Sequence, residues 1–147
     1  MAVPNGELSK RLEQFLRRAN TILFERGRAV LQDLEISELQ FNALISIQEY
    51  GPQTMGELCK SLFVACSTAT DLADRMELVE LVERVRDDKD RRIVRLHLLS
   101  KGKASLEAVI AERQKFLSEV LKGYTDREHN ELSYSLELLT ARMELKQ

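Results

Sequence analysis

The chain has 147 residues, of which 44% are hydrophobic and 31% charged, and its formal net charge is −2. This length and composition fit one globular domain and exclude a disordered chain. The chain has no run of about 18 apolar residues, so we expect no membrane span. Its first residues lack the basic region and apolar core of a signal peptide. Two cysteines are too few for a secreted disulfide framework, so we expect a cytoplasmic protein.

The first half of the chain has the apolar spacing and capping residues of helices. Ser37 and Thr54 are each followed three residues later by Gln or Glu, which is the capping box that starts a helix. The fourth helix has Ala65 where a polar cap is expected. Its inner stripe would consist of Ala69, Leu72, Met76 and Val79. We expect helices over residues 7–31, 38–50, 55–62 and 66–79.

A β-hairpin follows, because residues 81–86 and 93–98 alternate between apolar and polar side chains. The residues between them, 87–92, are all charged, which indicates a projecting loop. Two more helices are expected, over 102–122 and over 126–145, where Thr125 begins a third capping box.

The charges are unevenly distributed along the chain. The stretch from Arg84 to Arg95 has six basic and three acidic residues, whereas the other 135 residues have 16 basic and 21 acidic. A local basic patch on an acidic body can still bind an anion, since distant charges are screened beyond about 8–10 Å.

Two short helices joined by a tight turn form a helix-turn-helix, and a hairpin directly after them is a wing. This order resembles the MarR family of bacterial winged-helix regulators. The matching segments are Ile36–Phe41, Gly51-Pro52, Met55–Leu58, Asp74–Glu77, and Asp90-Arg91-Arg92 with Leu98 and Lys101-Gly102. We expect a mostly α fold with a small β-hairpin wing, in which the winged helix-turn-helix domain of residues 37–100 is flanked by long dimerisation helices in 1–36 and 101–147.

The resemblance implies a homodimer, held by its terminal helices, that binds a pseudo-palindromic operator in double-stranded DNA. Many members of the family release DNA on binding a small aromatic or lipophilic effector, and others respond to thiol oxidation. This chain departs from the common pattern at Phe63, where the turn usually has Gly, at Ala65, and at Asp88, where the wing often has Pro.

The candidate DNA contacts lie on the second short helix and the wing. Arg92 can enter a narrow minor groove if Asp90 holds its guanidinium extended. On the helix, Arg75 suits phosphate or guanine, and Asp71 or Asp74 could orient Arg75 or accept a hydrogen bond from cytosine. The alternatives are a solvated charged turn and an ordinary amphipathic core helix. The full predicted set is Ser67, Thr68, Asp71, Arg75, Arg84, Arg86, Lys89, Asp90, Arg91 and Arg92.

The two cysteines allow two interpretations. Cys66 begins a helix, where the helix dipole can lower the pKa of a thiol, and Cys59 lies seven residues earlier. They could form an oxidation switch, or both could be small apolar fillers of the core. We favour the fillers, because thiol-sensing members of the family generally carry their cysteine in the first long helix.

The sequence predicts no enzyme, no cofactor and no metal. It contains no Gly-rich phosphate loop, no nucleophile elbow and no paired carboxylates beside a histidine. Cys59, Cys66, His97 and His129 lack the spacing of a zinc site. We expect a cytoplasmic, homodimeric repressor. The alternatives are a thiol-oxidation sensor of the same fold and a helical protein-interaction module whose wing binds an acidic partner.

Overall fold

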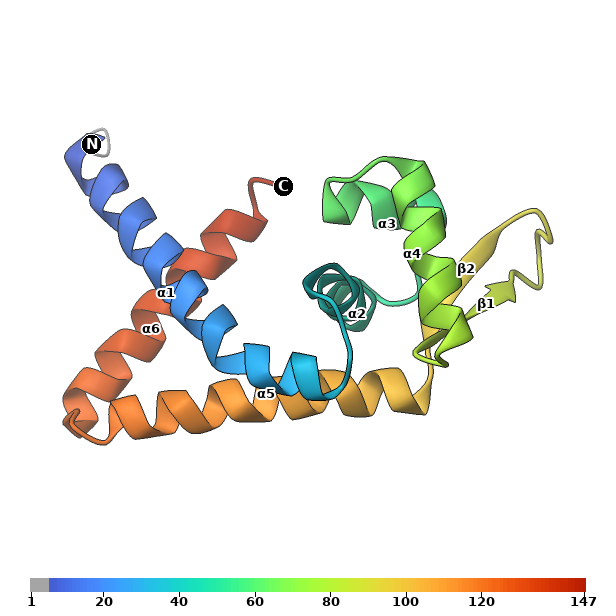
Figure 1. The fold of residues 1–147 in the computed structure, drawn as a ribbon. Coiled ribbons are helices and arrows are strands. Elements are labelled where there is room, and N and C mark those ends of the chain that lie inside the picture. Colours follow the sequence, from blue (N-terminus) through green and yellow to red (C-terminus); the bar gives the residue numbers. More distant parts are fainter. Residues whose placement is uncertain (1–5) are drawn as a thin grey trace. The chain divides into compact units, whose positions relative to one another are not determined.

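The computed structural model describes residues 6–147, which form six helices and one two-stranded antiparallel sheet (Figure 1). One compact unit extends as far as Arg113, and a second covers Gln114–Gln147. The expected fold class is confirmed, and every expected helix and strand is present with each end within two residues of its prediction. The elements are α1 (Gly6–Asp33), α2 (Glu38–Tyr50), α3 (Met55–Leu62), α4 (Cys66–Leu78), β1 (Val82–Arg86), β2 (Val94–Leu98), α5 (Ser100–Leu121) and α6 (Asp126–Glu144).

Capping residues start three of the helices where the sequence predicts them. At α2, the Ser37 hydroxyl accepts from the Gln40 amide at 3.1 Å, and the Gln40 side chain accepts from the Ser37 amide at 2.9 Å. Thr54 and Thr125 make the same reciprocal bonds at α3 and α6. Ala65 supplies no side-chain cap to α4, as expected. Each box satisfies two backbone N–H groups that the first helical turn leaves without partners.

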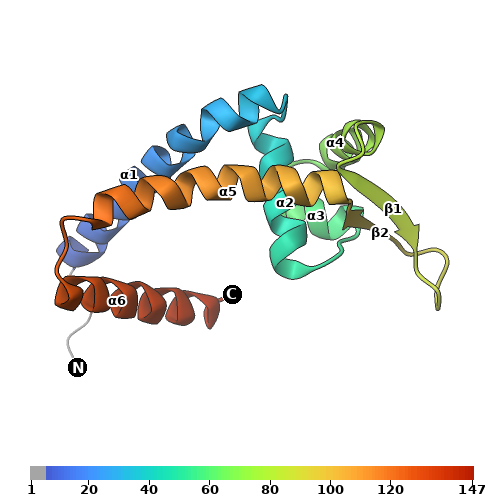
Figure 2. The ribbon, with the colours of Figure 1, turned by 90° about the horizontal axis from the view of Figure 1, so that it is seen from below.

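The core of the first unit lies between α2, α3, α4, the hairpin and the first half of α5. Its largest fully buried side chains are Phe41, Leu44, Leu58, Met76, Leu81, Val82, Leu96, Leu106 and Val109. The hairpin loop extends away from this core, beyond α4, in both views (Figures 1 and 2). The hairpin is therefore buried at its base, at Leu81, Val82 and Leu96, and its loop is accessible.

A one-residue bridge adds a third strand position to the sheet. The Leu96 amide donates to the Gln53 carbonyl at 2.7 Å, and the Gln53 amide donates back at 3.3 Å. The buried Ser46 hydroxyl donates to the Gln53 side-chain oxygen at 3.0 Å. The sequence does not predict this bridge, because a single paired residue has no alternating pattern.

The end of α4 differs from the sequence prediction. The sequence predicts Val79 on the inner stripe, but Val79 is 43% exposed and follows the last residue of the helix. Glu80 then adopts a left-handed conformation with φ 61°, which turns the chain into the buried Leu81 and Val82. Helical periodicity predicts which face a residue occupies only inside a helix, and α4 ends at Leu78, one residue before Val79.

A glycine allows α5 to begin close to the chain leaving α4. A Cβ atom on Gly102 would overlap the backbone carbonyl of Leu81 and press on the Leu44 side chain. The neighbouring Lys101 ammonium donates to the Val79 carbonyl at 2.9 Å. This contact and the close approach explain why a Lys-Gly pair stands here.

Candidate nucleic-acid interface

Helix α4 has a buried apolar face and an exposed polar face. Ala69, Leu72 and Met76 are buried, as the sequence predicts. The predicted DNA-contacting residues of the helix are all exposed, namely Ser67, Thr68, Asp71 and Arg75. An exposed helix face of short donors, one cation and one carboxylate can donate to and accept from base edges and phosphates.

Arg84 on β1 joins this helix to the hairpin. Its guanidinium donates to Asp74 Oδ1 at 2.6 Å and to Glu77 Oε1 at 3.0 Å, and its backbone amide donates to Glu77 Oε2 at 3.0 Å. Partial burial opposes the charged form of Arg84, but the hydrogen bonds to Asp74 and Glu77 outweigh it and raise the pKa of the guanidinium. Asp74 therefore pairs with Arg84, and among residues 6–147 neither Asp71 nor Asp74 forms an ion pair with Arg75, contrary to one expectation from the sequence.

Asp87 organises the loop at the tip of the hairpin. Its Oδ1 accepts from the amides of Asp90 and Lys89, at 3.0 and 2.8 Å, and its Oδ2 accepts from Arg95 Nη1 at 2.7 Å. These hydrogen bonds lower the pKa of the Asp87 carboxyl, and those from the two backbone amides have the largest effect. Neither Asp87 nor Arg95 is among the site residues that the sequence predicts. An aspartate at the start of a charged turn is the available signal, because such a side chain often caps the amides two and three residues on.

Asp90 and Arg92 form the contact that the sequence predicts. Arg92 Nε and Nη2 donate to the two carboxylate oxygens of Asp90, each at 3.1 Å, and the Arg92 amide also donates to Oδ1 at 3.1 Å. The hydrogen bonds from the Arg92 side chain and backbone lower the pKa of Asp90, and the same pairing raises the pKa of Arg92. The Arg92 side chain remains 91% exposed. Two parallel hydrogen bonds to Asp90 thus restrain the Arg92 guanidinium, which remains accessible to a ligand.

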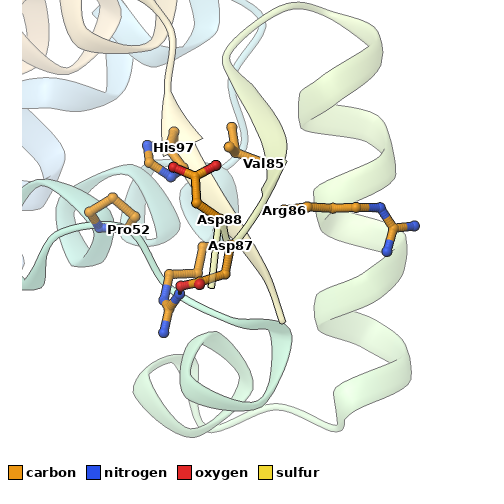
Figure 3. A pocket seen from close by; sticks show the side chains of 7 residues that line it. Pro52, Val85, Arg86, Asp87, Asp88 and His97 are labelled. Atoms are coloured by element: carbon orange, nitrogen blue, oxygen red, sulfur yellow. Dashed lines mark hydrogen bonds and ion pairs between the residues drawn. The ribbon is translucent and has the colours of Figure 1, made fainter. Parts of the chain in front are cut away.

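The remaining basic residues of the wing are also at the surface. Arg86 Nη1 donates to the Arg91 carbonyl at 2.9 Å, which closes one side of the loop, and Lys89 and Arg91 are exposed. An open pocket lies along the hairpin, and Figure 3 shows Arg86 pointing away from Pro52, Asp88 and His97. The pocket is lined by Pro52, Val85, Arg86, Asp87, Asp88, Arg95 and His97.

The structure corrects the favoured interpretation of the cysteines. Cys59 is buried, but Cys66 is exposed and is therefore no core filler. The two residues are joined by a disulfide, with their Cα atoms 5.2 Å apart. The turn between α3 and α4 brings them together, a tertiary effect that a spacing of seven residues does not reveal. Among residues 6–147, no group of histidine, cysteine, aspartate or glutamate is arranged to hold a metal ion.

An exposed second helix of a helix-turn-helix, tied to a basic hairpin, defines a winged helix-turn-helix protein. The model of the MarR family matches residues 36–94. A curated relative, the uncharacterized HTH-type transcriptional regulator YsmB of Bacillus subtilis, is 44% identical over 117 residues, which are 80% of each chain. The HTH-type transcriptional repressor MdtR of the same organism is 30% identical over 93 residues, covering 63% of this chain and 60% of that one.

Solved structures agree with these relatives. A MarR family protein from Bacillus stearothermophilus superimposes with a TM-score of 0.83 at 40% identity, covering 97% of this chain and 99% of that one. The chain belongs to the MarR family. It is a helix-turn-helix transcriptional regulator and not an enzyme.

Proposed function

We propose that the chain is a homodimeric repressor that binds a pseudo-palindromic operator in double-stranded DNA. In this proposal α4 enters the major groove and Arg92 enters the adjacent minor groove. Residues 37–100 form the DNA-binding region, and 1–36 and 101–147 form the dimerisation region. The protein acts in the cytoplasm, and a small aromatic or lipophilic effector releases it from DNA. The effector and the repressor role rest on the likeness to the family and its named repressors.

The observation that carries the proposal is the link between α4 and the wing. Arg84 on β1 donates to Asp74 and Glu77 of α4, so two ion pairs link the helix to the hairpin. A recognition helix and a wing that already have a fixed spacing can enter successive grooves of DNA without losing further conformational entropy on binding. Arg84 takes part in the proposed interface as the residue that joins the two elements. Asp71 remains available to accept from a cytosine amino group.

Exposed apolar side chains support the dimer. Leu8, Leu12, Phe15 and Ile22 on α1 are each between 40% and 57% exposed. Helix α6, considered by itself, contains no buried residue, although Leu132, Leu136 and Leu138 lie along it. Apolar stripes of this kind are typical of surfaces that a partner covers. A second copy of the chain would cover them.

The test is equilibrium binding of the purified protein to operator duplex over a range of salt concentrations. Two lobes making on the order of 6–10 phosphate contacts predict a slope of log K against log salt of about −5 to −9. Retention on an acidic polypeptide, measured beside DNA, serves as the comparison. A slope shallower than about −2, or equal retention on the polypeptide, would favour the protein-interaction alternative.

A further inference from the structure

The cysteine pair lies where the two helices of the helix-turn-helix meet. Cys59 is in the second turn of α3, and its carbonyl accepts from the Val64 amide at 3.1 Å. Phe63, in a left-handed conformation, reverses the chain, and Cys66 begins α4 three residues later. The resulting Cα separation of 5.2 Å lies within the range of about 4.4–6.8 Å that disulfides span.

The two sulfur atoms have different surroundings. Cys59 is only 6% exposed, and its Sγ is 3.2 Å from the Gly56 carbonyl oxygen, which can accept from the thiol when the bond is reduced. Cys66 is exposed and is the first residue of α4. The first turn of α4 contains no acidic residue, and no side chain caps it. The partial positive charge of an uncapped helix N-terminus favours a thiolate.

We propose that Cys59 and Cys66 form a reversible dithiol–disulfide pair that is oxidised by a hydroperoxide, with Cys66 as the attacking thiol and Cys59 as the resolving thiol. The Cys66 thiolate attacks the peroxide oxygen, the O–O bond breaks, and the alkoxide or hydroxide that leaves takes up a proton. The Cys59 thiol then displaces hydroxide from the Cys66 sulfenic acid, so that a disulfide and one water form. Two electrons pass from the two thiols to the peroxide.

The disulfide would protect the recognition helix from irreversible oxidation. A sulfenic acid without a neighbouring thiol continues to sulfinic and sulfonic acids, which are anions. Such an anion would lie beside Ser67 and Thr68, where the proposed function requires phosphate. The disulfide is uncharged and joins α3 to α4 at the spacing that the fold already has. This consequence for DNA rests on the proposed function, whereas the thiol chemistry does not.

The experiment treats the whole protein, first reduced and then desalted, with equimolar hydrogen peroxide. Intact mass and free-thiol count are measured under denaturing conditions. We expect the wild type to lose both thiols and two hydrogen atoms without forming interchain dimers, and dithiothreitol to restore both thiols. Two free thiols after treatment, or interchain products, would overturn the proposal. So would a chain that resists peroxide and is oxidised only by a small disulfide.

Matched variants separate the two roles. Cys66→Ser leaves only the buried thiol and should be oxidised at least about tenfold more slowly than the wild type. Under an excess of hydrogen peroxide of about three equivalents, Cys59→Ser, or Cys59→Ala if serine disturbs the core, leaves Cys66 unresolved and should gain two or three oxygen atoms, whereas the wild type should stop at the disulfide. Equal oxidation rates for Cys66→Ser and wild type would reverse or remove the assignment of the attacking thiol.

DNA binding is then measured on the same treated samples. Oxidised wild type should bind operator duplex as the reduced protein does, and peroxide-treated Cys59→Ser should bind at least about tenfold more weakly, because its helix N-terminus has become anionic. Release of wild type by peroxide would overturn the protective role. If no sample binds DNA while the thiol results hold, the proposed function has failed and the cysteine chemistry has not.

Discussion

The pairing of Asp90 with Arg92 has two opposite electrostatic effects at the tip of the wing. The carboxylate brings a negative charge toward DNA, and it also fixes the direction of the guanidinium through two hydrogen bonds. We expect orientation to be the larger effect, so Asp90→Ala should weaken DNA binding although it makes the loop more basic. Arg92→Ala should weaken binding roughly tenfold or more and flatten the preference for A·T pairs flanking the half-sites.

The wing is tested by a double-mutant cycle on operator binding. The double variant should cost less than the sum of the single variants, because each removes the same oriented contact. In free Arg92→Ala protein, the pKa of Asp90, measured by NMR titration, should rise toward its ordinary value, since the guanidinium that lowers it is gone. Asp88→Ala is the matched control, because it removes the same charge from the same loop. The Asp88 carboxylate has no hydrogen bond or ion pair within residues 6–147. Tighter binding by both aspartate variants would reduce the loop to a diffuse cationic patch.

Phe63 is a second residue whose conformation predicts an outcome. It has φ 55° and is 95% exposed, so its ring adds little burial while its Cβ strains the left-handed backbone. Phe63→Gly should raise the free energy of unfolding by about 1 kcal/mol, measured by urea denaturation. Phe63→Ala keeps the Cβ and should leave the stability nearly unchanged. A gain of equal size in both variants would show that the ring, not the backbone, is the source of strain.

Among the elements, those specified by neighbouring residues could be predicted from the sequence. The capping boxes at Ser37, Thr54 and Thr125 fix helix starts through bonds across three residues, and the starts of α2, α3 and α6 were predicted correctly. The contact between Asp90 and Arg92 is equally local, and the sequence predicts it correctly for that reason. Asp74–Arg84 and Cys59–Cys66 were not predicted as pairs, because each depends on how one element packs against another.

The start of α5 gives a prediction about packing. Gly102→Ala would place a methyl group against the Leu81 backbone carbonyl, which cannot rotate away as a side chain can. We expect the free energy of unfolding to fall by about 1–3 kcal/mol, despite the better helix propensity of alanine. Gly56→Ala in α3 is the control, because the nearest atom to its new Cβ is 3.9 Å away, and it should be neutral or stabilising by up to about 1 kcal/mol. Equal effects at the two glycines in urea denaturation would contradict the packing argument.

At the scale of the whole molecule, the proposed dimer makes DNA binding depend on residues far from the wing. The apolar stripe of α1 includes Phe15, which is 57% exposed in the single chain. Obligate dimer interfaces commonly bury 2,000 Å² or more, and a charge placed within one is left without water or a partner. The wild type should therefore sediment as a dimer at micromolar concentration, and Phe15→Asp should shift it toward monomer. Gln14→Asp, which adds the same charge outside the stripe, should remain dimeric.

The same variants separate assembly from recognition of DNA. A monomer presents one helix-turn-helix and one wing, so it loses the gain that comes from holding two half-sites at once. Phe15→Asp should weaken operator binding by at least about a hundredfold, and its salt slope should fall toward half the wild-type value, because half of the phosphate contacts are gone. Arg92→Ala should weaken binding while sedimenting as a dimer. A Phe15→Asp protein that is monomeric yet binds the operator like the wild type would show that one lobe reads DNA alone, and the pseudo-palindromic arrangement would then be wrong.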